Sequence, residues 1–175
     1  MKAYRDFCSM KPMLARDLMT VGVPTCKTST PILDIARFLL QENVEEMVVL
    51  DEEGHGVGVV GIEQLVTVYG QPDIEGLTAE QVMSEGVPDL PTDVPLPLAA
   101  QMLKDRHIRV AYMLHNSAGI IYPAAYLSYR HILRHMAARS ESELKDLGLA
   151  AERKSPLEQF IERRDAALRK VGLRD

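Results

Sequence analysis

The chain has 175 residues and a hydrophobic share of 46%, enough for a sizeable core, and its two cysteines, Cys8 and Cys26, are too few for a disulfide framework. The net charge is −5, and residues 1–138 hold 11 basic against 17 acidic residues, an excess that argues against a nucleic-acid-binding surface. No stretch has the roughly 18 apolar residues of a membrane span, and the N-terminus lacks a leader pattern, so we expect a cytoplasmic protein with no membrane partner.

The first half of the chain predicts six elements in the order helix, strand, helix, strand, strand, helix. In the second of these helices the apolar residues Ile32, Ile35 and Leu39 recur at helical spacing and form one face. The paired strands are separated by the E-G-H-G run at 53–56, where glycines interrupt two apolar segments. The predicted ranges are 15–19, 23–26, 32–42, 47–50, 57–60 and 62–69.

The second half repeats this order. The run D-L-M-T at 17–20 recurs as Q-V-M-S at 81–84, an offset of 64 residues that persists through the helix and strand that follow. The offset becomes 67 residues at the last strand-to-helix junction, where Gly61 corresponds to Ser128. Such a match in constant register indicates two copies of one supersecondary unit. The corresponding ranges are 79–83, 87–90, 96–106, 110–114, 120–127 and 129–138.

Each copy is too small to bury much surface alone. Two copies that pack sheet to sheet would hide both apolar faces. We therefore expect residues 12–138 to form one intramolecular pair, joined by the Q-P-D-I-E-G run at 71–76.

Ser128 lies where the last strand of the second copy is expected to meet its closing helix. The first backbone N–H groups of a helix lack intrahelical partners and carry partial positive charge, so a phosphate is stabilised there. The other interpretation is that Ser128 only caps the helix, since serine is a favoured N-cap.

The D-L-M-T run, the amphipathic helix, the two strands and the G-V-V-G-I-E-Q run at 58–64 together resemble the CBS domain, and the tandem resembles a Bateman module. The resemblance covers about three quarters of the chain. It implies an α+β fold of two pseudo-symmetric units that pack through their small sheets. It also implies a regulatory, non-catalytic module that binds an adenine nucleotide or another adenosyl ligand between the copies, commonly as a homodimer of modules. The expected division is an N-terminal extension at 1–11, units at 12–70 and 78–138, a linker at 71–77 and a helical tail at 139–175.

In ligand-binding members of that family a Ser or Thr at the junction contacts phosphate, and an Asp three residues later holds the ribose hydroxyls. Here the second copy has Ser128 followed by His131, and the first copy has Gly61 followed by Gln64, so neither copy retains the full pair. We expect the second cleft to be the better site. The candidate contacts are Ser128, Arg130 and His131 for polar groups, His107 and Arg109 for a phosphate, Val23, Pro24, Thr25, Val87, Pro88 and Asp89 for a base, and Gly61 and Gln64 in the first copy.

The expected ligands are AMP, ADP, ATP or S-adenosylmethionine, bound as regulators rather than as catalytic cofactors. His131 and His135 are four residues apart and would share a helical face, but no further ligand stands at a convincing spacing, so we expect no metal site. No activated nucleophile or phosphate loop is visible, so we expect no enzyme activity.

The tail shows two helix-start patterns, S-E-S-E at 140–143 and S-P-L-E at 155–158. The second predicts an amphipathic helix that either packs on this module or its dimer partner, or docks an effector protein. Two functions remain open: a ligand sensor that signals to such a partner, and a ligand-free dimeric interaction module whose clefts have degenerated. The apolar side of the tail helix consists of Leu157, Phe160, Ile161, Leu168 and Val171.

Overall fold

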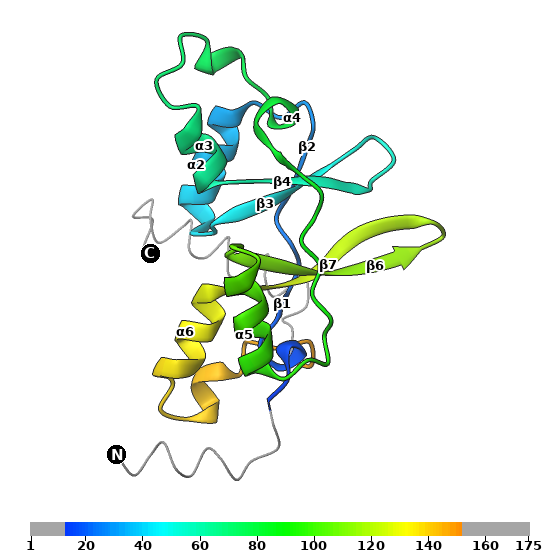
Figure 1. Cartoon of the computed structure of the whole chain (residues 1–175), viewed down its shortest axis with the longest axis vertical. Coiled ribbons are helices and arrows are strands. Elements are labelled where there is room, and N and C mark those ends of the chain that lie inside the picture. The colour runs from blue at the N-terminus through cyan, green and yellow to red at the C-terminus, as the bar shows by residue number, and fades with distance from the viewer. Residues whose placement is uncertain (1–12, 152–175) are drawn as a thin grey trace, which may run out of the picture.

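The computed structural model describes residues 13–151, which form two small β-sheets with helices on the same side of both (Figure 1). One sheet has three strands in the order β1-β7-β6, and the other has four in the order β2-β3-β4-β5. The expected α+β architecture of two similar units is confirmed. Within the described range no helix is long and apolar enough to span a bilayer.

The helices and hairpins of the first copy follow the sequence pattern. Helix α2 occupies the predicted range, because its buried residues Ile32, Ile35 and Leu39 form one stripe and Asn43 ends it in the left-handed conformation. The elements are η2 (Ala15–Asp17), β1 (Thr20–Val21), β2 (Thr25–Lys27), α2 (Ile32–Glu42), β3 (Glu46–Leu50), β4 (Gly56–Gly61), α3 (Ile62–Thr67) and η3 (Ile74–Gly76).

The second copy lacks one of its predicted strands. The segment 87–90 forms only a single parallel bridge between Asp89 and Tyr112, so the predicted strand there is wrong. Pro88 and Pro91 flank this bridge and have no N–H to extend a ladder. The elements are α4 (Ala79–Val82), β5 (Ser84–Glu85), α5 (Leu96–Asp105), β6 (Val110–Ser117), β7 (Ile120–Ser128), α6 (Tyr129–Ala137) and η4 (Glu141–Leu144).

Each copy contributes its opening segment to the sheet of the other copy. Strand β1 pairs antiparallel with β7, where Thr20 faces Tyr126, and β5 pairs with β4, where Ser84 faces Val59. In Figure 1 β1 accordingly lies with β6 and β7, whereas α4 lies with the other sheet. The sequence limits of the two units stay a prediction, since both sheets draw on both ranges.

The core has three parts that follow this arrangement. One cluster lies under α5 and α6 and includes Leu18 and Met19 from the exchanged N-terminal segment. A second lies under α2 and includes Ala79 from the other exchanged segment. The third lies between the sheets and confirms the expected sheet-to-sheet packing. Its buried members are Val48, Val59, Val110 and Tyr112.

The beginning of the tail is packed against the second copy. Leu144, Leu147 and Leu149 contact the cluster under α5 and α6. Gly148 has a φ of +92°, and a Cβ there would lie 2.7 Å from the carbonyl oxygen of Asp17. The helix predicted from residue 155 and the extension at 1–11 lie outside the described residues.

Candidate functional site

Two clefts between the sheets are related by the internal repeat. Cleft 1 has a volume of about 520 Å³ and lies between the β7–α6 junction and residues 43–46. Cleft 2 has about 290 Å³ and lies between the β4–α3 junction and residues 107–110. Cleft 1 contains the Ser128 junction and so corresponds to the second cleft of the sequence analysis, and it is the larger of the two.

At the junction in cleft 1, His131 connects three parts of the chain. The Ser128 amide donates to His131 Nδ1 at 3.0 Å, and the Ser128 hydroxyl lies 2.9 Å from the same nitrogen. Because Nδ1 accepts from the amide, the neutral ring carries its hydrogen on Nε2, which lies 2.8 Å from Thr20 Oγ1 and donates to it. His131 therefore fixes the exchanged strand β1 to the start of α6.

Burial keeps this histidine neutral. Ser128 is 4% exposed and His131 is 8% exposed. Desolvation, together with the positive charges of Arg134 and Arg130, lowers the pKa of His131 to about 4. The ring of Tyr126 packs edge-on against the imidazole, with centroids 5.1 Å apart.

Gln64 has the same role in cleft 2. Its Oε1 accepts from the Gly61 amide at 3.0 Å, and its Nε2 donates to the Ser84 hydroxyl at 2.9 Å. Ser84 is the repeat counterpart of Thr20. Gly61 permits a close approach of the backbone, since a Cβ would lie 2.6 Å from the carbonyl oxygen of Glu45.

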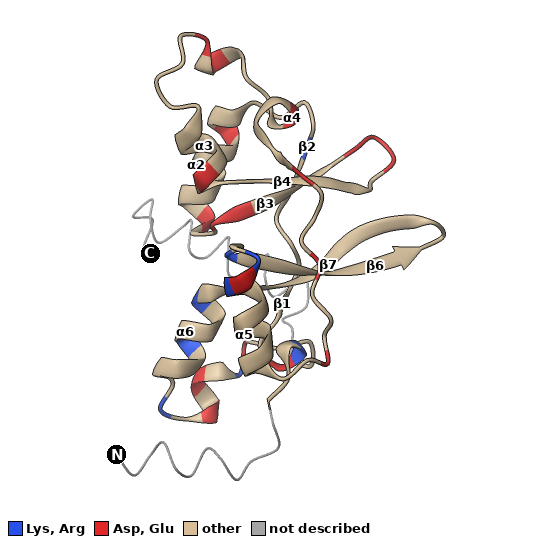
Figure 2. Ribbon diagram, viewed as in Figure 1, with Lys and Arg blue, Asp and Glu red and all other residues tan. Residues whose placement is uncertain are grey.

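The two clefts carry opposite charges at equivalent positions. In cleft 2 the Arg109 guanidinium lies 2.7 Å from Glu63. In cleft 1 the equivalent positions hold Glu45 and Arg130, and Arg130 donates to the carbonyl and side-chain oxygens of Asn43 at 2.8 and 3.0 Å. Basic residues accordingly gather on α6, whereas the other half of the molecule is mostly acidic (Figure 2).

The structure divides the other predicted contacts between several places. Pro24 lines cleft 1, whereas Pro88 and His107 line cleft 2. Val23 and Val87 pack into the core between the sheets. Thr25 pairs with Val48 in the four-stranded sheet, and the backbone oxygen of Asp89 accepts from Arg106. Val23, Thr25, Val87 and Asp89 thus line neither of the two clefts.

Sequence reasoning missed Glu46 and Tyr112 at the centre of the site. Glu46 lines both clefts, and its Oε1 accepts from the Tyr112 hydroxyl at 2.7 Å. Burial raises the pKa of Glu46 to about 7, although the hydrogen bond from Tyr112 opposes this shift. A carboxylate at the first position of the buried strand E-M-V-V-L was the available signal.

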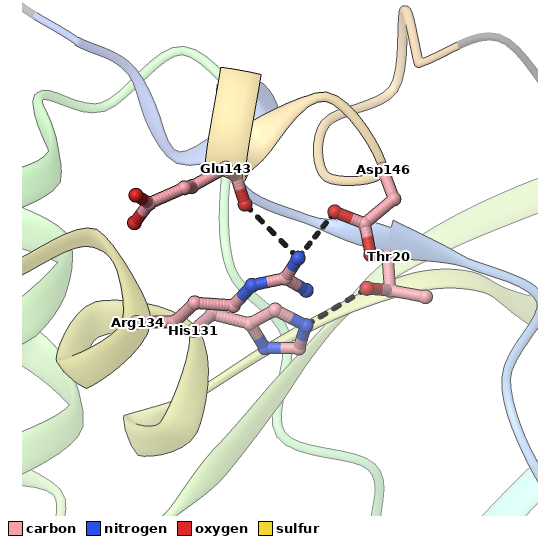
Figure 3. A network of polar contacts seen from close by, with 5 residues as sticks. All are labelled: Thr20, His131, Arg134, Glu143 and Asp146. Carbon is pink, nitrogen blue, oxygen red and sulfur yellow. Dashed lines mark hydrogen bonds and ion pairs between the residues drawn. The ribbon is translucent and has the colours of Figure 1, made fainter. Parts of the chain in front are cut away.

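Arg134 and Asp146 complete one wall of cleft 1 and were also missed. Figure 3 shows Arg134 reaching from α6 to the tail, where it donates to the Glu143 carbonyl at 3.0 Å and forms an ion pair with Asp146. That pairing lowers the pKa of the Asp146 carboxyl. Arg134 follows Arg130 by four residues, so their shared helical face could have been predicted.

The described part of the chain contains neither a cluster of metal ligands nor an activated thiol. Among residues 13–151 no three His, Cys, Asp or Glu side chains gather as metal ligands do. Cys26 is half-buried, and burial raises its pKa to about 11, so the thiol is protonated at neutral pH.

Comparison with known proteins agrees with the repeat. Residues 15–70 match the family model of the CBS domain. No curated protein matches the chain in sequence.

Solved structures extend the match over both copies. The CBS domain pair of protein MJ0100, in complex with 5′-methylthioadenosine and S-adenosyl-L-methionine, is 18% identical, with a TM-score of 0.64 over 74% of this chain and 100% of that chain. The CBS-domain protein ATU1752 from Agrobacterium tumefaciens is 17% identical, with a TM-score of 0.63 over 73% and 96%. CBSX2 in complex with AMP is 20% identical, with a TM-score of 0.57 over 70% and 95%. Residues 15–70 thus match the CBS domain family, and the described chain has the fold of the tandem CBS pairs to which it is similar.

Proposed function

We propose that this protein is a regulatory module that binds an adenosyl ligand, an adenine nucleotide or S-adenosylmethionine, in cleft 1. The observation that carries the proposal is the combination of Ser128 at a helix N-terminus with Arg130 and Arg134 around one cleft. Two arginines and the first turn of α6 suit an anionic group. The volume of about 520 Å³ lies in the range of small-molecule sites.

Cleft 2 is the weaker candidate for a phosphorylated ligand. Its one arginine, Arg109, is paired with Glu63, and Glu85 adds a negative charge that cleft 1 lacks, whereas Glu45 and Glu46 line both clefts. These carboxylates repel a phosphate at this range, so the binding free energy of an anion is less favourable there than in cleft 1.

Calorimetric titration of the full chain with AMP, ADP, ATP and S-adenosylmethionine tests this proposal. We expect one of them to bind and Arg130→Gln to weaken it about tenfold, since a charge-assisted hydrogen bond contributes about 1.5 kcal/mol or more. The matched variant Arg109→Gln removes the equivalent arginine of cleft 2 and should leave the affinity unchanged. Absence of heat with all four ligands, or equal loss in both variants, would contradict binding in cleft 1.

A ligand-free interaction module remains the second candidate, and one observation favours it. Ser128 and His131 already satisfy each other and Thr20, as Gln64 satisfies Gly61 and Ser84, so these groups need no ligand. In either case we propose a cytoplasmic homodimer without catalytic activity, and the ligand-binding form would signal its occupancy to an effector protein. The protein contacts in this proposal are supported by exposed apolar side chains on or beside the helices: Leu40, Val66, Tyr69, Leu133 and Met136.

A further inference from the structure

The segment after α6 forms part of the wall of cleft 1. We call residues 140–149 the strap. Its Gly148 amide donates to the Met19 carbonyl at 2.9 Å, and its Leu149 amide donates to the Arg16 carbonyl at 2.8 Å. These bonds place Asp146 and Leu147 at the cleft beside Arg130 and Arg134. The strap therefore connects the cleft to the start of the remaining tail.

An internal carboxylate holds one of the two arginines of the cleft. Asp146 pairs with Arg134, and the Glu143 carbonyl of the same strap accepts from the same guanidinium nitrogen (Figure 3). A phosphate or a ligand carboxylate would offer Arg134 the same chemistry as Asp146 does. Arg134 cannot make its full set of hydrogen bonds to both anions at once, so the ligand and Asp146 of the strap compete for it.

The ion pair between Arg134 and Asp146 is weak enough for a bound anion to break it. The side chains of Arg134 and Asp146 are 44% and 67% exposed, and an ion pair that exposed contributes at most about 1 kcal/mol. A bound anion supported by Arg130 and the α6 N-terminus can exceed that contribution. Displacing Asp146 removes a polar anchor of the strap and leaves its apolar contacts and two backbone bonds.

We propose that Asp146 is a stand-in for the anionic group of the ligand, so that an anionic ligand in cleft 1 takes Arg134 from Asp146 and loosens the strap. This inference rests on the proposed function and adds how occupancy reaches the tail. We call the strap closed when Asp146 pairs with Arg134 and open when that pair is broken. The ligand shifts the strap because its affinity differs between these two states. The closed strap lowers the apparent affinity by the fraction of molecules that it holds closed.

The test compares phosphorylated ligands with their neutral counterpart on the full chain. AMP, ADP and ATP are each paired with adenosine, which lacks the phosphates. Asp146→Asn keeps the shape but removes the charge, and we expect it to tighten binding of the anionic member about threefold and to leave the neutral member unchanged. The control Asp34→Asn breaks an exposed Asp–Arg pair on α2, away from both clefts, and should change neither.

Hydrogen exchange supplies a second readout that does not depend on affinity. In the wild type the anionic ligand should speed exchange of the Gly148 and Leu149 amides, whereas its neutral counterpart should not. Binding with unchanged strap exchange, together with equal affinity in Asp146→Asn, would overturn this inference and leave the proposed function intact. Failure of every ligand to bind would overturn both.

Discussion

At the scale of single residues, His131 stands at a position where the resemblance to the CBS family implies a ligand contact. The imidazole accepts from the Ser128 amide and donates to Thr20, and Gln64 makes the equivalent two bonds in the other copy. Imidazole and amide side chains can accept with one atom and donate with another, which an ionised carboxylate cannot. The replacement of Asp is therefore consistent with a structural role in both copies.

We predict that His131→Gln preserves this clamp and that His131→Ala does not. The glutamine can reproduce the two bonds of Gln64, so its free energy of unfolding at pH 7 should stay close to that of the wild type. The alanine leaves the buried Ser128 amide without its acceptor and removes the bond to Thr20, and we expect it to lower the free energy of unfolding by about 2 kcal/mol. Urea denaturation of both variants measures the difference, and equal losses would refute the clamp.

The same histidine should make the protein sensitive to acid. Its pKa of about 4 in the folded state lies below the ordinary 6.5, so the unfolded chain binds more protons between these values. Stability contributed by His131 is complete above pH 6.5 and is lost as the pH falls toward 4. Between pH 7 and pH 5 the wild type should therefore lose about 2 kcal/mol more than His131→Gln in urea denaturation. Identical pH dependence would show that His131 titrates normally.

At the scale of elements, the sequence predicts those helices and strands whose apolar residues recur at a regular spacing, and few others. Helix α2 and the two hairpins were predicted because their apolar residues repeat at 3.6 or 2 residues and glycines mark the turns. The exchange of β1 and β5 between the sheets was not predicted. Each strand has only two residues, too few to show a periodic pattern, and its pairing partner is distant in sequence. Ser128 was located correctly at its junction, whereas Glu46 reaches the clefts only through the pairing of the two sheets.

The exchanged strand β5 gives an element-scale prediction. A Cβ on Gly58 would lie 2.7 Å from both the Ser84 carbonyl oxygen and the Met83 sulfur, so Gly58→Ala should push β5 away from β4. Such overpacking costs about 1–3 kcal/mol. Hydrogen exchange should quicken at Gly86, whose amide bonds to Val57 across this edge.

Ser84→Ala is the matched control for Gly58→Ala. It removes only the exposed hydrogen bond from Gln64 and leaves the backbone pairing of β5 intact, so its cost should stay below about 1 kcal/mol. A larger effect from Ser84→Ala than from Gly58→Ala would mean that the side-chain bond, and not the strand pairing, fixes the exchanged segment.

At the scale of the whole molecule, the two units meet at an apolar layer, to which Glu46 adds a carboxylate. Tyr112 of the second copy is 1% exposed and donates to Glu46 of the first copy across this layer. Glu46 also lines both clefts, so its charge acts on a ligand in either of them. The protonation of Glu46 therefore affects both the packing of the two units and the charge of the clefts.

The pH dependence of unit packing should follow Glu46. Its pKa is about 7 in the folded state against an ordinary 4.5, so the folded chain binds more protons between these values. Stability must then fall as the pH rises from 4.5 to 7 and level off above that range. Glu46→Gln keeps an acceptor for Tyr112 but has no charge to bury. Relative to the wild type, its free energy of unfolding should therefore gain on the order of 2 kcal/mol between pH 4.5 and pH 8.

Tyr112→Phe separates the hydrogen bond from the burial in this prediction. It removes the hydroxyl that favours the ionised carboxylate and leaves the ring in the layer, so the pKa of Glu46 should rise further. The loss of stability between pH 4.5 and pH 8 should then be steeper than in the wild type, opposite to the result for Glu46→Gln. If urea denaturation gives all three proteins the same pH dependence, Glu46 is hydrated in solution, and its charge does not determine how the two units pack.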